Sequence, residues 1–464
     1  MKTRIESDSL GKRAIPKDAY YGIQTHRALE NFPISGQKPK PAYVEATVHI
    51  KKAAAIVNHK LGVLDVRKSR AIVRASDEIL RGKLREWFLV DVYQAGAGTS
   101  HNMNTNEVIA NRAIEILGGE KGDYSIVHPN DHVNMSQSTN DVCPTAIRIA
   151  SLTLTEKLSE SLKQLEMEFK LKGKQFNHVV KSGRTHLQDA VPVRLGQEFR
   201  AYGVNIQKHR AAISAAADSC KELGIGGTAT GTGLNSHPKY RALMINQLSK
   251  QVGIRFAKAD DYFEAMQSLR PMVALSGAVR NLAQDLIRIA NDIRLLASGP
   301  KTGLAELNLP AVQPGSSIMP GKVNPVMAEM LTMVCFQAIG YDTTVLLAAQ
   351  AGQLELNVMM PVVAFDLLHE IEILSNAITA FTKLCLRGIT ANEKRGKMYA
   401  EASMSIVTVL NPHLGYAKAA EIAKECLKSG KSIREILLER HLFTEKQIDT
   451  IFDLRAMTEP GIRK

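Results

Sequence analysis

Cysteine is scarce in this chain of 464 residues, and no two of its five cysteines form a CxxC pair. An odd number of widely spaced cysteines argues against both a disulfide framework and a zinc site. We therefore expect the protein to work in a reducing compartment and to need no metal. The cysteines are Cys143, Cys220, Cys335, Cys385 and Cys426.

Clustered charge of one sign and long apolar runs are also lacking. The formal net charge of +13 is spread along the chain, and it does not form the clustered basic footprint with interleaved aromatics that is typical of nucleic-acid binding. No apolar run approaches the roughly 18 residues of a membrane span, and no signal-peptide h-region follows Met1. We expect a cytoplasmic protein that binds small anions, with neither nucleic acid nor membrane as a partner.

A sustained β pattern is absent, whereas helical periodicity is strong. Three apolar seams recur at intervals of three and four residues, which is typical of long amphipathic helices. One of these helices is predicted over residues 266–297, with a kink at Pro271. The pattern predicts an all-α protein with an antiparallel bundle that other subunits extend. The seams are Leu154, Leu158, Leu162, Leu165, Phe169; Val279, Leu282, Leu286, Ile289, Ile293, Leu296; and Leu367, Ile371, Leu374, Ile378, Phe381.

The two ends of the chain differ from this middle part. The first forty residues are rich in Pro, Gly and polar residues, so we expect an extended arm and turns before a first helix near Tyr43. Near the other end, capping-box patterns start at Ser432 and Thr444 and predict two short helices in a small separate domain.

Several catalytic motifs are missing. The chain has no Cys/His cluster for zinc, no close pair of carboxylates for glycosidic hydrolysis and no GxSxG elbow. The glycine-rich segment 224–235 lacks the GxxxxGK[ST] order of a phosphate loop, and no strand pattern precedes it. These absences exclude the corresponding classes of enzyme.

The most informative segment that is present runs from Gly315 to Pro325 and reads GSSIMPGKVNP. Two glycines and two prolines in eleven residues exclude a helix or a central strand, so the segment is predicted to be a loop with accessible backbone amides. Its hydroxyls, amide and ammonium all favour negative charge. We interpret it as a loop that binds an anion or stabilises an oxyanion.

Three other polar segments stand out between the predicted helices, at residues 96–107, 130–141 and 183–190. The first alternates three asparagines, which fits either a strand or a helix start, and taken alone a turn with a helix cap explains it equally well. The second lies at the start of a long helix, where backbone N–H groups attract a carboxylate or phosphate. The third contains His186, which alone would more often be a structural histidine.

Together these segments contain many hydrogen-bond donors and only one or two possible bases. Such a site suits removal of a proton next to a carboxylate, because the aci-carboxylate that forms carries extra negative charge. Elimination follows if the adjacent carbon bears a leaving group.

The loop matches the pattern GSSxMPxKxNP, and on this motif the chain resembles the aspartase/fumarase superfamily over nearly its whole length. The resemblance extends to residues 18–22, 98–100, 138–141, 183–189 and 231–235 and to the C-terminal part. It implies a three-domain all-α lyase fold with a central long-helix bundle and a homotetramer with a common helical core, in which three subunits share each active site. The implied domains are 1–140, 141–395 and 396–464.

Within this superfamily the sequence resembles the aspartase branch in residues 97–104 (AGTSHNMN), 138–141 (STND) and 351–354 (AGQL). In contrast, residues 331–333 resemble fumarases, and Gln350 and Met360 depart from the aspartase pattern. The resemblance therefore implies reversible deamination of a C4 amino dicarboxylate without a cofactor. Class II fumarase chemistry is the alternative, and an inactive structural or binding protein derived from a lyase is a remote one.

Site residues are implied by the same resemblance. Ser316 would be the base that removes the C3 proton, and Glu329 would orient His186. The β-carboxylate would be held by Thr99, Ser138, Thr139 and Ser317, the α-carboxylate by Lys322 and Asn324, and the amino group would be surrounded by Asn140, Thr185 and His186.

Overall fold

The computed structural model describes residues 2–462. The contacts between residues divide the chain into two compact units, which are described separately below. Unit 1 comprises Met1–Glu160, His209–Gln284 and Val334–Ser375; unit 2 comprises Ser161–Lys208, Asp285–Met333 and Asn376–Lys464.

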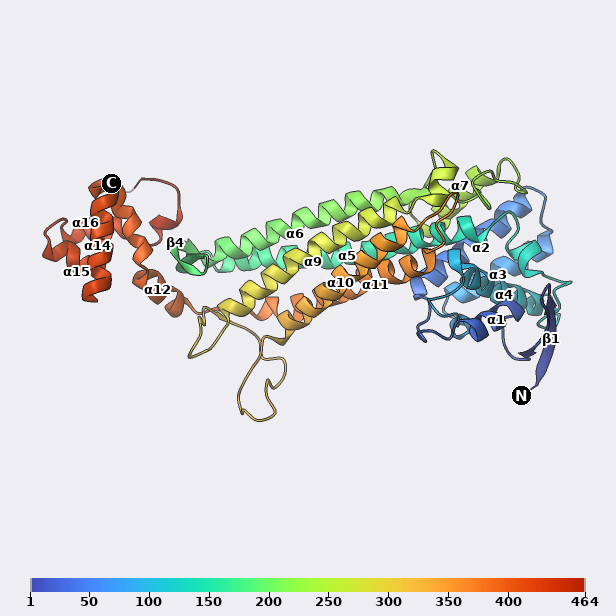
Figure 1. The fold of residues 1–464 in the computed structure, drawn as a ribbon, viewed down its shortest axis with the longest axis horizontal. Helices are drawn as coiled ribbons and strands as arrows, with labels where there is room; N and C mark the ends of the chain where they lie inside the picture. Colours follow the sequence, from blue (N-terminus) through green and yellow to red (C-terminus); the bar gives the residue numbers. More distant parts are fainter. Residues whose placement is uncertain (1, 463–464) are drawn as a thin grey trace. The chain divides into compact units, whose positions relative to one another are not determined.

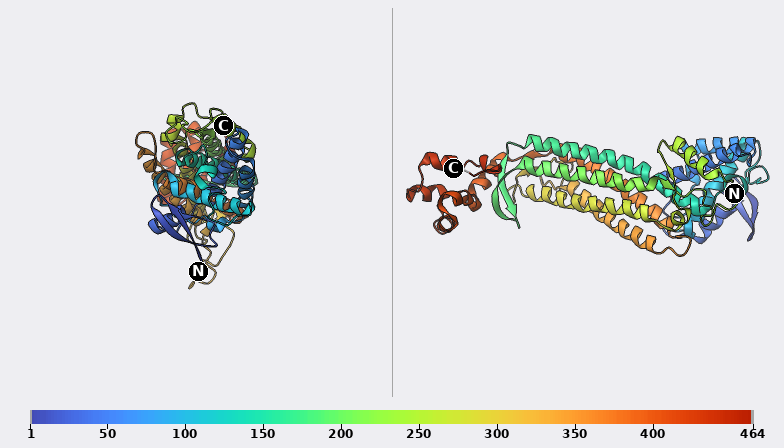
Figure 2. Two further views of the ribbon diagram at one scale, coloured as in Figure 1. Left: turned by 90° about the vertical axis from the view of Figure 1, so that its right-hand side faces the viewer. Right: turned by 90° about the horizontal axis from the view of Figure 1, so that it is seen from above.

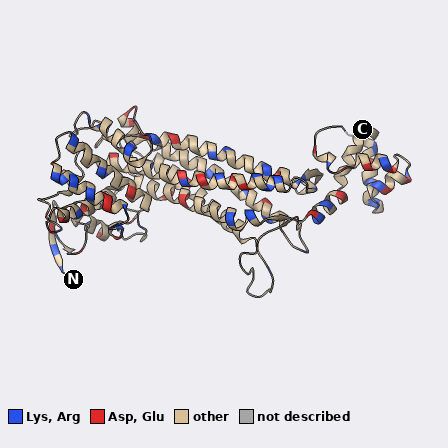
Figure 3. Cartoon of the chain, turned by 180° about the vertical axis from the view of Figure 1, so that it is seen from behind, with Lys and Arg blue, Asp and Glu red and all other residues tan. Residues whose placement is uncertain are grey.

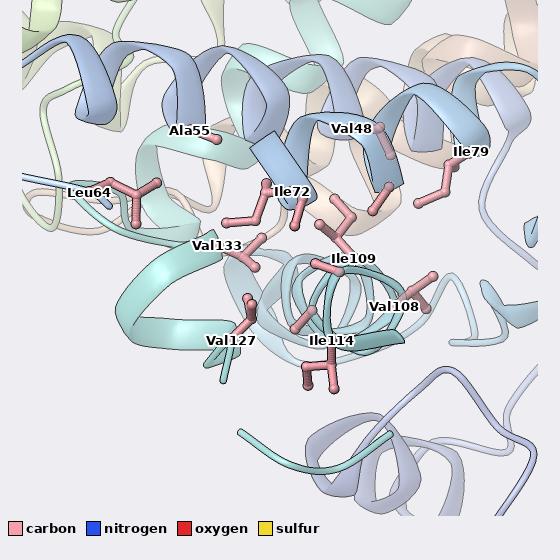
Figure 4. Packing of buried hydrophobic residues seen from close by; sticks show 14 of the residues in the cluster. Val48, Ala55, Leu64, Ile72, Ile79, Val108, Ile109, Ile114, Val127 and Val133 are labelled. Atoms are coloured by element: carbon pink, nitrogen blue, oxygen red, sulfur yellow. The ribbon is translucent and has the colours of Figure 1, made fainter. Parts of the chain in front are cut away.

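Three helices form the N-terminal core of unit 1, namely α2 (Pro41–Lys60), α3 (Val66–Leu80) and α4 (Thr99–Ile116). The first has its proline at the start, where the missing N–H costs nothing, and the Asp65 side chain caps α3 by accepting two backbone N–H groups. Buried branched side chains from the three helices interdigitate between them (Figure 4). This packing fixes the position of α4, whose first residue is Thr99.

Each of five long helices contains residues of both units. Within each unit, the segments of these helices run side by side (Figures 1 and 2). All members of the three apolar seams are at least nine-tenths buried, so the predicted helical faces are confirmed. In unit 1, Ser276 bonds to Glu370, and in unit 2, Tyr202 bonds to Asp292. The five helices are α5 (Thr139–Gln175), α6 (Leu195–Asp218), α9 (Arg270–Leu296), α10 (Val326–Gln350) and α11 (Met360–Leu384).

The predicted helix over residues 266–297 is wrong in one respect. The structure ends α8 (Tyr262–Gln267) and begins α9 at Arg270, with a short break in place of a kink inside one helix. Pro271 lies in the first turn of α9, where no intrahelical N–H bond is lost.

Helix α10 is apolar and long enough, by length and composition, to cross a membrane, although a core helix passes the same test. Glu329 and Asp342 interrupt its apolar residues, so the sequence contains no uninterrupted apolar run of membrane-spanning length here. Only a third of its most apolar stretch is buried within the single chain. Met333, Phe336 and Leu347 lie on one face of the helix, and each is more than half exposed.

The structure also contains short strands that the sequence pattern did not predict. Hairpin β1–β2 (Thr3–Asp8 and Gly11–Pro16) and helix α1 (Ile23–Asn31) occupy the region expected to be an arm with turns. Hairpin β3–β4 (Val180–Thr185 and Gln188–Arg194) occupies the third polar segment. Two-residue strands pair β5 (Glu222–Leu223) with β6 (Ala257–Lys258) and β7 (Leu307–Asn308) with β8 (Thr390–Ala391).

The C-terminal part of unit 2 has its own apolar core, formed by residues between Ile406 and Ile451. Both predicted capping boxes are present, at Ser432 and at Thr444. The division into three domains stays a prediction. The remaining helices are α7 (Tyr240–Val252), α12 (Glu393–Ala402), α13 (Asn411–Leu414), α14 (Tyr416–Ser429), α15 (Ile433–Glu439) and α16 (Glu445–Ile451).

Basic and acidic residues are interspersed along the helices, as Figure 3 shows. The fold class is all-α, as the sequence predicts, because strands contribute only four two-stranded sheets in the part of the chain that the structure describes.

Candidate active site

The loop Gly315–Pro325 belongs to unit 2, and hydrogen bonds between Gly315, Lys322 and Asn324 close it. The Gly315 N–H donates to the Lys322 carbonyl over 2.8 Å, and Asn324 Nδ2 donates to the Gly315 carbonyl over 2.6 Å. A Cβ atom on Gly315 would lie 2.5 Å from the Lys322 carbonyl oxygen, so only glycine fits here. These two hydrogen bonds therefore hold residues 316–321 as one preformed loop.

Inside this loop, backbone donors point at the Ser316 hydroxyl. Ser316 Oγ accepts hydrogen bonds from the N–H groups of Ile318, at 3.2 Å, and Met319, at 2.9 Å. The side chains of Ser317 and Lys322 are exposed. Two fixed N–H donors stabilise a negative charge on the serine oxygen, which is what a serine base requires.

In unit 1, three predicted site residues gather at the start of α5. Ser138 precedes the helix, and its Oγ accepts the N–H of Asn140 over 3.2 Å. Thr139 Oγ1 accepts from Asn102 Nδ2 of α4 over 3.1 Å. The Asn140 amide donates to the Ala229 carbonyl over 2.8 Å, which leaves its oxygen free as an acceptor. The helix N-terminus adds positive potential to this group.

Thr99 lies at the start of α4, in the same region of unit 1. The two residues before it, Ala97 and Gly98, both have positive φ angles, of 61° and 90°. A Cβ atom on Gly98 would come within 2.8 Å of Cys143 Sγ, so glycine is required by both backbone conformation and space. Thr99 is exposed, and Asn102, three residues later, links α4 to Thr139. The structure thus brings Thr99, Ser138, Thr139 and Asn140 together.

Asp141 connects this group to the glycine-rich segment 224–235. Its carboxylate is fully buried and accepts the N–H groups of Ser138 at 2.9 Å, Gly226 at 2.9 Å and Thr228 at 3.0 Å. Burial raises the pKa of Asp141 to about 6, against the opposing effect of these three donors. The segment that superficially suggested a phosphate loop is therefore a support for the start of α5.

Thr185 and His186 lie at the tip of hairpin β3–β4 in unit 2. His186 and Leu187 form its two-residue turn with φ angles of 54° and 58°, a conformation that usually requires Asn or Gly. Both side chains are exposed. Non-glycine residues in such turns are strained and often mark functional sites.

Buried charges anchor the base of this hairpin. Glu306, almost fully buried, pairs with Lys181 at 3.2 Å and Arg184 at 3.0 Å. Lys181 also pairs with Glu198 of α6 at 3.0 Å. Removing one partner from such a set leaves a buried charge unpaired, which is strongly destabilising. The set therefore holds the hairpin tip in place.

The other predicted residues belong to a different unit from the four at the starts of α4 and α5. Four lie in unit 1, whereas Thr185, His186, Ser316, Ser317, Lys322, Asn324 and Glu329 lie in unit 2. Among the described residues, no hydrogen bond or ion pair joins the hairpin tip to the serine loop, and none joins Glu329 to His186. The role of Glu329 stays a prediction.

Two supporting residues, Asp141 and Glu306, were not predicted as parts of the site. Asp141 follows directly after the predicted binding residues, and an aspartate in the first helical turn is a common signal by itself. Glu306 gives no sequence signal, because its partners come from a segment more than 100 residues earlier. In the part of the chain covered by the structure, no group of three or more His, Cys, Asp or Glu residues is arranged to hold a metal ion.

The geometry describes a helical protein with a serine hydroxyl that accepts two backbone N–H groups and with polar side chains gathered at helix starts. Comparison with known proteins places it in a family. Residues 11–340 match the family model described as "Lyase", and residues 406–459 match "Fumarase C C-terminus". The chain belongs to this lyase family, the aspartase/fumarase superfamily.

Curated relatives cover the whole chain. It is 50% identical to an aspartate ammonia-lyase of Bacillus subtilis over 99% of this chain and 97% of that protein. It is 46% identical to the aspartate ammonia-lyase of Escherichia coli K12, over 99% and 97% respectively.

Solved structures share the fold. A fumarate lyase/delta crystallin of Brucella melitensis bound to cobalt is 48% identical, with a TM-score of 0.96 over 99% of this chain and 100% of that one. A class II fumarase of Schistosoma mansoni is 38% identical, with the same TM-score and coverage.

Replacing Asp141 by Asn is expected to lower the melting temperature at pH 7, because one acceptor becomes a donor that faces a backbone N–H, a loss of about 1–3 kcal/mol. The loss should grow by about 1 kcal/mol at pH 5. The reason is that the native carboxyl, with its pKa of about 6, binds a proton before the unfolded one near 3.8. Wild-type stability from this group therefore rises as the pH falls through that window.

Thermal unfolding followed by circular dichroism at both pH values measures this difference. Asp131→Asn is the control, since the Asp131 side chain is 74% exposed and should leave the melting temperature unchanged. If the Asp141→Asn variant melts at the same temperature as the wild type at both pH values, the carboxylate does not support this region.

Proposed function

We propose that this protein is an aspartate ammonia-lyase, which converts L-aspartate reversibly to fumarate and ammonia. The observation that carries the proposal is the Ser316 hydroxyl with two backbone N–H groups directed at its oxygen. The names of full-length relatives at 46–50% identity support the same reaction.

Proton abstraction is the first step. The Ser316 alkoxide takes the proton from C3 of aspartate, and the electron pair left on C3 moves into the adjacent β-carboxylate to give the aci form. Without help a serine is far too weak a base for this proton. The N–H groups of Ile318 and Met319 lower that cost because they are in place before the substrate arrives.

Two sets of donors bind the two carboxylates. Thr99, Ser138, Thr139 and Ser317 hold the β-carboxylate, whose charge increases in the aci form, so their hydrogen bonds strengthen as the reaction proceeds. Lys322 contributes its ammonium to the α-carboxylate, and Asn324 contributes the N–H that its bond to Gly315 leaves over.

The amino group leaves in the second step. The C2–N bond breaks as the electron pair returns from the aci-carboxylate to form the C2–C3 double bond of fumarate. The free oxygen of Asn140 accepts from the ammonium, and Thr185 and His186 complete its surroundings. These roles require the hairpin tip and the serine loop to meet the start of α5.

Assembly into a homotetramer, in which three subunits share each active site, brings the hairpin tip, the serine loop and the start of α5 together. In its support, Met333, Phe336 and Leu347 are exposed on one face of α10, and large apolar side chains gathered on a surface mark protein–protein interfaces. We place the enzyme in the cytoplasm, which is supported by five cysteines that are all free and buried.

Incubating the purified protein with L-aspartate or L-malate, and following fumarate by its absorbance, distinguishes the candidate reactions. We expect fumarate from L-aspartate and none from L-malate. Fumarate from L-malate alone would instead identify a class II fumarase. No product from either substrate, in a protein that still binds succinate, would identify an inactive member of the family.

Replacing Ser316 by Ala should reduce kcat for L-aspartate by at least about a hundredfold, which is the contribution expected of a positioned base. The circular dichroism spectrum should not change, because the Ser316 side chain is only half-buried. Ser429→Ala, outside the proposed site, is the control and should retain full activity. A Ser316→Ala variant with near-normal turnover would remove this residue as the base.

A further inference from the structure

A lysine is completely buried beneath the carboxylate-binding end of α5. Lys51 of α2 is 0% exposed, and its Nζ donates to three amide oxygens: Asn102 Oδ1 at 2.7 Å, Asn134 Oδ1 at 2.8 Å and Gln137 Oε1 at 3.1 Å. No carboxylate pairs with it in the described part of the chain. A buried lysine without a counterion is costly, and the chemistry proposed above does not use it.

The lysine fixes the orientation of all three amides, because an ammonium can only donate and each amide must turn its oxygen inward. For two of them, the hydrogen bonds of the amide nitrogen agree with this orientation. Asn134 Nδ2 donates to the Gln137 carbonyl over 3.2 Å, and Gln137 Nε2 donates to the Val133 and Met135 carbonyls over 3.1 Å. The third amide, Asn102, donates from its nitrogen to Asn134 Oδ1 over 3.3 Å and to Thr139 Oγ1 over 3.1 Å.

The orientation of Asn102 consequently leaves the hydrogen of the Thr139 hydroxyl available to a ligand. The hydroxyl oxygen accepts from Asn102 Nδ2 over 3.1 Å, and within the described residues its own hydrogen forms no bond. If the amide were turned, its oxygen would take this hydrogen instead. The hydroxyl is only half-buried, and a carboxylate, which accepts through both oxygens, can use the hydrogen in either of its orientations, whereas a carboxamide can use it through one oxygen only.

We propose that Lys51 is a positioning residue that determines specificity: through the Asn102 amide, it makes Thr139 a hydrogen-bond donor and so selects a carboxylate over a carboxamide at the β position. The inference rests on the proposed function, since it assumes that Thr139 holds the β-carboxylate. It adds a chain of hydrogen bonds, Lys51 to Asn102 to Thr139 to substrate, that starts on a separate helix.

The charge state of Lys51 sets the conditions for the test. Burial lowers the pKa of Lys51 to about 7, and the negative charge of Asp141 opposes this shift. Binding measurements at about pH 6 keep the ammonium form predominant. Succinate is the carboxylate probe, and succinamate, in which one carboxylate is replaced by an amide, is the mismatched probe.

Replacing Lys51 by Met removes the charge and lets the Asn102 amide turn. We expect succinate to bind about tenfold more weakly, because a charged hydrogen bond is lost, while succinamate binding changes little. The preference for succinate over succinamate should therefore fall, which a merely structural defect would not produce. Lys52→Met is the matched control, since Lys52 is the next residue on α2 and pairs with Asp77 at 2.6 Å.

A second variant covers the case in which Lys51→Met does not fold. Asn102→Asp keeps a partner for the lysine but has no N–H for Thr139, so the hydroxyl should turn its hydrogen toward the new carboxylate and the preference for succinate should again fall. In a Thr139→Val background, each of these substitutions should change the preference by less than about twofold, because the hydroxyl on which they act is gone.

Isothermal titration of the intact protein gives the affinities, and turnover of L-aspartate is measured beside them. If the wild type turns over L-aspartate but both variants keep its succinate preference, or if their effects persist unchanged without the Thr139 hydroxyl, the role of Lys51 is refuted while the proposed function stands. If the wild type turns over no L-aspartate, the proposed function itself fails.

Discussion

The structure depends on one kind of interaction: backbone N–H groups are directed at an oxygen before any charge forms on it. At Ser316 they come from Ile318 and Met319, and the loop that presents them is closed by the Gly315–Lys322 and Asn324–Gly315 hydrogen bonds. Donors that are fixed in advance need no reorganisation when charge develops. In the proposed reaction, this arrangement is what would let a serine act where a stronger base is otherwise needed.

The same principle operates at the start of α5, with different supports. Asp141 accepts backbone N–H groups from both the helix start and the glycine-rich segment, and the buried Lys51 donates to three amides, Asn102 among them. In unit 2, Glu306 holds the hairpin through Lys181 and Arg184. Three of the four polar segments are thus attached to buried charges, which explains how exposed turns keep a defined geometry.

Much of the fold could be predicted from the sequence, because helical periodicity and capping are local signals. The seams from Leu154 to Phe169 and from Leu367 to Phe381 are buried as predicted, and the capping boxes at Ser432 and Thr444 are present. Hairpin β3–β4 could not be predicted, since its strands lack alternation and its stability comes from Glu306, which lies far along the chain.

Resemblance predicts residues for the candidate site, whereas it predicts none of the residues that support them. Lys51 did leave a trace in the sequence, because it falls on the stripe of Val44, Val48 and Ala55 that is buried in α2. A lysine on an apolar stripe predicts a buried charge that has a structural or functional role. The partners of that charge lie on other helices, so only the structure identifies them.

We propose that the carboxylate-binding residues of one subunit act with the serine loop of another. Co-expressing two inactive variants, Thr139→Val and Ser316→Ala, in equal amounts tests it most directly. If the two parts come from different subunits, mixed tetramers should contain some sites with neither substitution, about a quarter of the total for random assembly. We expect aspartate deamination to return to about that fraction of wild type, whereas activity no higher than that of either variant alone would show that the two parts do not come from different subunits.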